Sequence, residues 1–288
     1  MTLTNVKSWL ERGQREGFAV GAFNANTLEQ IQAIVLAAEA EKAPVIVQIS
    51  HRALQYIGSG SETLGLQYVA AIGKIAAQSV RVPVALHLDH ATETEVLQAI
   101  SLGFTSVMFD GSLLPYEQNV EITRRLYYAA QAANVCFEAE IGEVPKPGVS
   151  ESVEALTDPD EAAAFVEATG IDTLAVALGS IHAVTEKHVS IDLERLKAIR
   201  RVVDVPLVLH GSSGVNDNEI AEAIRLGLSK VNVATQFNVV FSRAVRSVLT
   251  DDPQVVDPRK YLAPARDAMQ AAVAERLRFF GIAGKAIR

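Results

Sequence analysis

The chain has 288 residues, of which 49% are hydrophobic and 21% charged, and its formal net charge is −8. This is the composition of a soluble, well-cored globular protein, and the acidic balance is unlike that of a nucleic-acid-binding protein. No apolar run reaches the roughly 20 residues that a membrane helix needs, and the polar amino-terminal segment is neither a signal nor a transit peptide.

We therefore expect a cytoplasmic protein with no nucleic-acid or membrane partner. The length suits a single domain spanning residues 1–288. Cys136 is the only cysteine, which excludes an intrachain disulfide and a zinc cluster built on thiolates. We expect it to be a buried thiol within a strand.

Eight short apolar runs alternate with longer segments of helical periodicity. The runs cover residues 19–23, 44–50, 82–90, 105–110, 135–140, 172–178, 206–211 and 230–235. Several are rich in Val, Ile and Leu with little alternation, as expected for strands buried on both faces. Eight such units predict an α/β fold of the (β/α)8 (TIM) barrel type, which typically takes about 250 residues. An open doubly wound sheet is the alternative, but the turn GAFNANT lacks the glycines that such a sheet often carries there.

Helix start and stop signals support this alternation. Capping residues stand where four helices should begin, at Thr27, Thr92, Asp158 and Asn216. Glycines stand where three of them should end, at Gly103, Gly170 and Gly227. An extra helix is expected before Ala19, closing the bottom of the barrel, and further helices are expected after about residue 236.

A barrel forms its active site at the carboxyl ends of its strands, so the residues at those ends are the candidates. Three of the six histidines fall there: His90, His182 and His210. Three neutral imidazoles with one open position make a catalytic zinc site, in which the metal acts as a Lewis acid. The alternative is that these histidines bind phosphate or act singly without a metal. His87 shares a strand face with Asp89 and is predicted to be a core or supporting histidine.

Carboxylates stand at the same strand ends. Asp89 is the candidate general acid/base, because a nearby cation keeps a carboxylate ionised. The alternative is that Asp89 only orients His90. Glu140 is a candidate metal ligand or supporting group, and Glu138 lies on the same strand face. The long acidic loop at 141–157 is predicted to be a lid that brings an acid to the substrate.

The segment after the seventh apolar run, His210-Gly-Ser-Ser-Gly, precedes a helix start. Successive backbone N–H groups and a helix amino terminus can hold a phosphate, and barrels often use the loops after strands seven and eight for this purpose. The segment therefore predicts an anion-binding site, with a plain left-handed turn as the alternative.

Together these segments identify a family. The chain resembles the class II, zinc-dependent ketose-bisphosphate aldolases, close to the fructose- and tagatose-bisphosphate group, from about Asn5 to Ala244. The stretches that carry the resemblance are GAFNANTLE, PVIVQIS, LHLDHATE, EAEIG, LGSIH, VPLVLHGSSG and KVNVAT. It implies zinc ligation by His90, His182 and His210, and proton transfer at the C4 hydroxyl by Asp89. It also implies a pocket for the substrate formed by Asn24, Ser50, Gly211, Ser213, Asn232 and Thr235.

The activity that the resemblance implies is reversible aldol cleavage of a phosphorylated ketose, either fructose 1,6-bisphosphate or tagatose 1,6-bisphosphate. The products would be dihydroxyacetone phosphate and an aldehyde such as glyceraldehyde 3-phosphate, formed through a zinc-stabilised enediolate. Family members are dimers or tetramers, so a homodimer or homotetramer is expected, and the apolar carboxyl-terminal segment agrees with that. Such an activity belongs to carbohydrate metabolism and would fit glycolysis.

The chain also departs from the family pattern. The resemblance also implies a monovalent cation (Na⁺ or K⁺), which the usual glycine after the second zinc histidine helps to bind together with the phosphate. Ala183 replaces that glycine here, which weakens the case for both contacts. The lid is short, and Glu151 is the candidate for its acid. Ala234 occurs in tagatose-type members. The pair His51-Arg52, which we expect in a loop at the barrel mouth, is not a family signature, and the arginine could meet an anionic group of the substrate.

Other functions remain as alternatives. The substrate could be a different ketose 1-phosphate. A barrel metal hydrolase would commonly show His-x-His at the end of strand one, where this chain has Phe23-Asn24. A Schiff-base aldolase needs a lysine at a strand end, and Lys230 is expected at the opposite end of strand eight. The last alternative is a non-catalytic barrel that binds a sugar phosphate.

Overall fold

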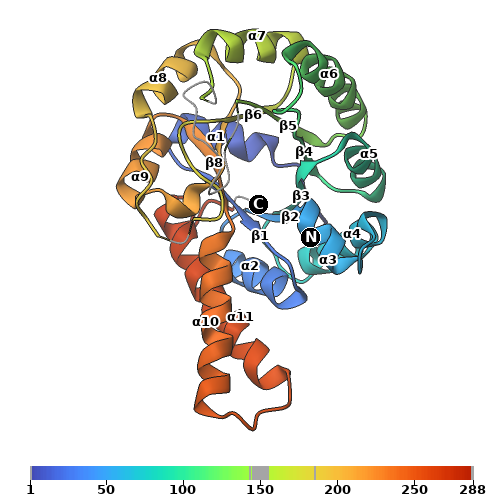
Figure 1. Ribbon diagram of the computed structural model, residues 1–288, viewed down its shortest axis with the longest axis vertical. Helices are drawn as coiled ribbons and strands as arrows, with labels where there is room; N and C mark the ends of the chain where they lie inside the picture. Colours follow the sequence, from blue (N-terminus) through green and yellow to red (C-terminus); the bar gives the residue numbers. More distant parts are fainter. Residues whose placement is uncertain (1, 143, 145–155, 185, 287–288) are drawn as a thin grey trace.

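The computed structural model describes residues 2–142, 144, 156–184 and 186–286. Within these ranges eight parallel strands close into a barrel in chain order (Figure 1). They are β1 (Val20–Asn24), β2 (Val45–Ser50), β3 (Val84–Ala91), β4 (Ser106–Phe109), β5 (Cys136–Ile141), β6 (Thr173–Val176), β7 (Leu207–Leu209) and β8 (Leu228–Val233). Each predicted strand is present, with ends that differ by a few residues, so the predicted (β/α)8 barrel is confirmed and the open sheet is excluded.

Helices surround the barrel. Around the barrel lie α2 (Leu28–Glu41), α3 (His51–Ile57), α4 (Glu62–Gln78), α5 (Glu93–Leu102), α6 (Tyr116–Ala132), α7 (Pro159–Thr169), α8 (Leu193–Val202) and α9 (Asp217–Arg225). Three predicted caps are confirmed, because the side chains of Thr27, Thr92 and Asp158 accept hydrogen bonds from N–H groups of the first turn. Asn216 precedes α9 as predicted, but its side chain makes no such bond.

Two residues expected elsewhere begin helices. Ser50 both ends β2 and caps α3 by accepting from the N–H of Ala53, so His51 begins a helix and does not lie in a loop. Thr235, expected at the end of strand eight, is the first residue of α10 (Thr235–Asp251). Both helices therefore begin at the barrel mouth and direct their amino termini toward it.

The predicted extra helix α1 (Lys7–Glu16) covers the amino ends of the strands. The N–H of Thr4 donates to the carbonyl of Val84 at the start of β3, and the ammonium of Lys7 lies 2.7 Å from Asp172, just before β6. The first contact satisfies a backbone carbonyl at a buried strand end, and the second pairs a buried carboxylate with a cation. The bottom of the barrel is thereby closed, as the sequence predicted.

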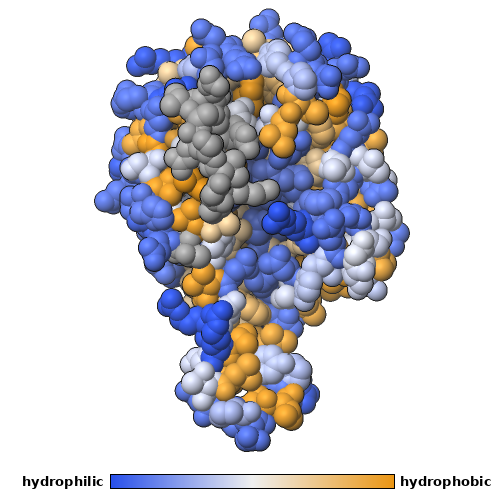
Figure 2. Space-filling view, in the orientation of Figure 1, coloured by the Kyte–Doolittle hydropathy of each residue, from blue (hydrophilic) through white to orange (hydrophobic). Residues whose placement is uncertain are grey.

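At the carboxyl terminus, α10 and α11 (Arg259–Phe279) pack on each other and project from the barrel as a hairpin (Figure 1). Figure 2 shows apolar side chains on the surface of this projection, and Leu249 and Val256 of the hairpin are exposed. The expected homodimer or homotetramer stays a prediction. In the part of the chain that the structure describes, no helix is both long and apolar enough to span a membrane.

Candidate active site

A cavity of about 610 Å³ opens at the carboxyl ends of the strands. Ten of the twelve residues predicted for the site line it: Asn24, Ser50, Asp89, His90, Glu140, His182, Gly211, Ser213, Asn232 and Thr235. Of the other two, His210 is fully buried with its ring 4.8 Å from that of His90, and the candidate lid acid Glu151 lies outside the described residues.

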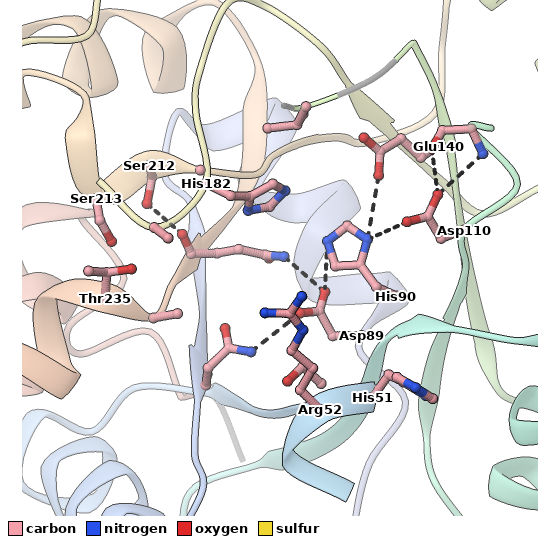
Figure 3. Close-up of a pocket in the computed structure, with 18 of the residues that line it drawn as sticks. His51, Arg52, Asp89, His90, Asp110, Glu140, His182, Ser212, Ser213 and Thr235 are labelled. Carbon is pink, nitrogen blue, oxygen red and sulfur yellow. Dashed lines mark hydrogen bonds and ion pairs between the residues drawn. The ribbon is translucent and has the colours of Figure 1, made fainter. Parts of the chain in front are cut away.

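The three candidate metal-binding histidines converge at this cavity: His90 and His182 line it (Figure 3), and the buried His210 lies beside them. One ring nitrogen from each of His90, His182 and His210 lies within 4.8 Å of the others. The ring centroids are 4.8 Å apart for His90 and His210 and 5.3 Å apart for His90 and His182. Side chains from three separate barrel units can therefore donate to one ion, which is the arrangement a three-imidazole metal site requires.

A backbone irregularity allows Asp89 and His90 to serve the same cavity. Consecutive residues of a regular strand point to opposite faces, so one of the two should face away from it. His90, however, has φ of 50°, and the pairing of β3 with β4 shifts register between Leu88 and Ala91. A left-handed non-glycine residue is uncommon and persists where the surrounding structure holds it. The bulge turns both side chains toward the mouth.

Gly211 brings the loops after β6 and β7 together. Its φ is 65°, and a Cβ at this position would lie 2.9 Å from the backbone of Ile181. Only glycine allows both the left-handed conformation and this approach. His210 and His182 are the neighbours of these two residues, so the close contact of the loops places the two imidazoles in one site.

Carboxylates set the orientation of two imidazoles. Nδ1 of His90 lies 2.7 Å from Asp110, and Nε2 of His210 lies 3.0 Å from Glu138. The other two ring nitrogens, Nε2 of His90 and Nδ1 of His210, face each other at 3.0 Å. Metal-binding histidines typically hold a carboxylate on the second nitrogen. Asp110 was not among the predicted residues, although its position at the end of the fourth apolar run was a signal for it.

Glu140 contributes a buried oxygen to the same place. Its Oε2 has no hydrogen-bond partner among the described residues and lies 3.8 Å from Nδ1 of His90 and 4.0 Å from Nδ1 of His210. Burial raises the pKa of Glu140 to about 7 against the opposing attraction of the two imidazoles. An unpartnered buried acceptor beside three convergent imidazoles fits a bound divalent cation.

The electrostatic surroundings also favour a cation. Burial disfavours a charge on His90, but the attraction of Asp89, Asp110 and Glu140 is larger and raises the pKa of His90 to about 10. The same carboxylates would stabilise a metal at this position. We therefore regard His90, His182 and His210, with Glu140 beside them, as able to hold a divalent metal.

Asp89 is held in a fixed orientation by two amides. Asn24 donates to one carboxylate oxygen and Asn232 to the other, each over 3.3 Å, and Gln48 in turn donates to Asn24 over 3.0 Å. Burial opposes the charge of Asp89, yet the imidazoles of His90 and His210 hold its pKa below the usual value. Asn24 and Asn232, predicted to contact substrate, therefore also aim an ionised carboxylate into the cavity.

The predicted anion site lies where Ser212, Ser213 and Thr235 line the cavity, close together (Figure 3). Gly211 is followed by a 3₁₀ turn at Ser212–Gly214, and Ser213 Oγ accepts from the N–H of Gln236 in the first turn of α10. The amino terminus of this 17-residue helix, at Thr235, adds positive potential. Ala183, which lines the same cavity, has φ of 61° and adopts the left-handed conformation that a glycine adopts more readily.

Arg52 supplies the positive charge that the acidic chain otherwise lacks here. Of the described residues that line the cavity, it is the only lysine or arginine. It is exposed, and its guanidinium makes no hydrogen bond or ion pair within the described residues. From α3 it lines the same cavity as the candidate anion site (Figure 3).

The structure changes the interpretation of Lys230. The strand begins earlier than predicted, at Leu228, so Lys230 lies within β8 and is buried in the barrel. Its ammonium lies 2.7 Å from Glu138 and 3.3 Å from Nε2 of His87, and it does not line the cavity. His87 is fully buried, as predicted for a core histidine, and burial lowers its pKa to about 3.

Comparison with known proteins adds independent information. The sequence model of the family described as fructose-bisphosphate aldolase class-II matches residues 4–285. The chain is 42% identical to fructose-bisphosphate aldolase of Geobacillus stearothermophilus over 99% of both chains. It is 39% identical to 6-phospho-5-dehydro-2-deoxy-D-gluconate aldolase of Bacillus licheniformis over 100% of this chain and 98% of that one. The crystal structure of the YdjI aldolase from Escherichia coli K12 is similar, with a TM-score of 0.83 and 30% identity over 99% of this chain and 100% of that chain.

Proposed function

Because the chain belongs to the class II fructose-bisphosphate aldolase family, and is therefore an aldolase and a carbon–carbon lyase, we propose that it cleaves a ketose bisphosphate reversibly with the help of bound zinc. The proposed substrates are fructose 1,6-bisphosphate or tagatose 1,6-bisphosphate, and the products are dihydroxyacetone phosphate and glyceraldehyde 3-phosphate. One observation carries the proposal: three imidazoles converge beside the carboxylate of Asp89, which Asn24 and Asn232 hold in a fixed orientation.

The residues divide the work as follows. The turn after β7 and the amino terminus of α10 bind the phosphate of the dihydroxyacetone half. His90, His182 and His210 would hold the zinc ion, which would supply Lewis acidity at the carbonyl oxygen. Asp89 takes the proton of the C4 hydroxyl, the C3–C4 bond breaks, and the aldehyde leaves. The electron pair left at C3 is delocalised toward C2, and an acid must return a proton to C3. We propose Glu151 for that role.

Removal of the metal provides a direct test. We expect a strong chelator to abolish turnover and added Zn²⁺ to restore it, because Lewis acidity at the carbonyl is then lost and regained. Borohydride added with substrate should leave the activity intact, since this route forms no imine. Full activity after demonstrated metal removal, or substrate trapped covalently on a lysine, would contradict the proposal.

A second candidate substrate differs only at the end away from the dihydroxyacetone phosphate. The Bacillus licheniformis relative is named for a substrate that carries a carboxylate at that end, whereas fructose and tagatose bisphosphates carry a phosphate there. Arg52 is compatible with both kinds of substrate, because a guanidinium binds a carboxylate as well as a phosphate. It is the only lysine or arginine among the described lining residues. Turnover of both bisphosphates, 6-phospho-5-dehydro-2-deoxy-D-gluconate and fructose 1-phosphate should be compared. No turnover of any of them would exclude the proposed function.

Arg52→Met should show whether Arg52 binds the end of the substrate away from the dihydroxyacetone phosphate. We expect kcat/KM to fall by about 10- to 100-fold for the substrate with an anionic far end, because a hydrogen bond to a charged group contributes about 1.5–3 kcal/mol. With fructose 1-phosphate, whose far end is neutral, kcat/KM should hardly change, which makes that substrate the internal control. An equal loss on both substrates would show that Arg52 acts on the catalytic centre and not on the far end.

A further inference from the structure

A charged cluster lies inside the barrel beneath the three imidazoles. Lys230 and Glu138 each expose 1% of their surface and His87 exposes none. Branched apolar side chains usually fill the interior of such a barrel, and a buried ion pair rarely adds stability over well-packed apolar residues. The proposed reaction uses neither Lys230 nor His87, so the presence of this cluster calls for another reason.

The contacts within the cluster form a chain that ends at the candidate metal site. The ammonium of Lys230 donates to one oxygen of Glu138 over 2.7 Å, and the other oxygen lies 3.0 Å from Nε2 of His210. Lys230 also lies 3.3 Å from Nε2 of His87, whose Nδ1 lies 2.7 Å from Ser106. Each oxygen of Glu138 is therefore engaged by one partner, which determines the position and the plane of the carboxylate.

We propose that Lys230 is a positioning residue for the metal site. It holds Glu138 so that this carboxylate accepts a hydrogen bond from Nε2–H of His210, and His210 then presents Nδ1 to the metal. A neutral imidazole carries one N–H, and the hydrogen bond made by one nitrogen determines which nitrogen remains free to bind. His87 completes the arrangement as the second acceptor for the ammonium. This inference rests on the proposed role of His210 as a metal ligand.

The competing explanation is that Lys230 and Glu138 only balance each other's buried charge, and that neither of them orients His210. The two explanations agree that Lys230→Met destabilises the fold, because it leaves a buried carboxylate without its cation. They differ in the double variant Lys230→Met/Glu138→Gln, which removes both charges. Charge balance predicts that stability and zinc affinity both return. Positioning predicts that stability returns while zinc affinity stays low, because an amide neither requires a particular tautomer of His210 nor raises the basicity of its ring as a carboxylate does.

The experiment measures the dissociation constant for Zn²⁺ by competition with a chelating indicator, together with Tm, in metal-depleted full-length protein. We expect Lys230→Met to weaken zinc binding by about 10- to 100-fold, the usual effect of losing a group that orients a metal ligand. The matched control is Lys7→Met. It breaks an ion pair of the same length to the buried Asp172 at the opposite end of the barrel, and should lower Tm without changing zinc affinity.

A second readout follows the imidazole itself. Long-range ¹H–¹⁵N spectra of the metal-free protein should show His210 protonated at Nε2 in the native chain and in Lys7→Met, and a mixture of tautomers in Lys230→Met. Unchanged zinc affinity in Lys230→Met, or zinc affinity that returns with Tm in the double variant, would overturn the inference. Failure of the native protein itself to bind zinc would instead refute the proposed function, so the two failures are distinguishable.

Discussion

His210→Ala is expected to reduce turnover to background and to lower the zinc content far below one ion per chain. The imidazole is fully buried, and its Nδ1 lies 3.0 Å from Nε2 of His90. The methyl group of alanine cannot coordinate a metal, and two remaining imidazoles no longer hold it at the substrate carbonyl. Metal analysis of the purified variant and a coupled assay for dihydroxyacetone phosphate measure both effects.

His188→Ala is the matched control, because this histidine is exposed and does not line the cavity. It should retain zinc and activity. If His210→Ala kept stoichiometric zinc and a large part of its turnover, the three-imidazole site would be wrong, and the second cluster, His90, Asp110 and Glu140, would become the candidate metal site.

Asp89→Ala is expected to retain zinc while kcat falls by about 10²–10⁴, the usual contribution of a positioned general base. The separation of the two effects follows from the geometry. Asp89 lies 3.9 Å from Nε2 of His90, too far for a hydrogen bond, whereas Asn24 and Asn232 both donate to it. Asp89 is therefore held by amides and does not itself orient the imidazole.

Two rates in this variant test the assignment. Cleavage needs a base for the C4 hydroxyl, but proton exchange at C3 of dihydroxyacetone phosphate does not, so exchange should survive better than cleavage. If Asp89 instead served to orient His90, zinc would be lost and both rates would fall together. An Asp89→Ala protein purified without zinc, under conditions in which the native protein retains it, would therefore rule out the role of general base.

The sequence alone was sufficient for the architecture and for the main candidate residues. Strands covered on both faces must be continuously apolar, so the eight runs are visible without any knowledge of their partners. Caps such as Thr27 and Thr92 act within one helical turn, and they too are local signals. Because parallel strands of a barrel direct their carboxyl ends to one mouth, placing His90 and His210 at strand ends already implied that they converge.

Only the tertiary structure decided how these residues act together. Strand alternation predicts opposite directions for Asp89 and His90, and the bulge that overrides it depends on how β3 pairs with β4. The partners that orient the imidazoles, Asp110 and Glu138, come from other strands, and no local pattern indicates which carboxylate meets which ring. Lys230 shows the same limit. In the sequence it stands near the end of strand eight that is far from the mouth, but its long side chain reaches Glu138. Contacts inside a closed barrel depend on three-dimensional neighbours and not on distance along the chain.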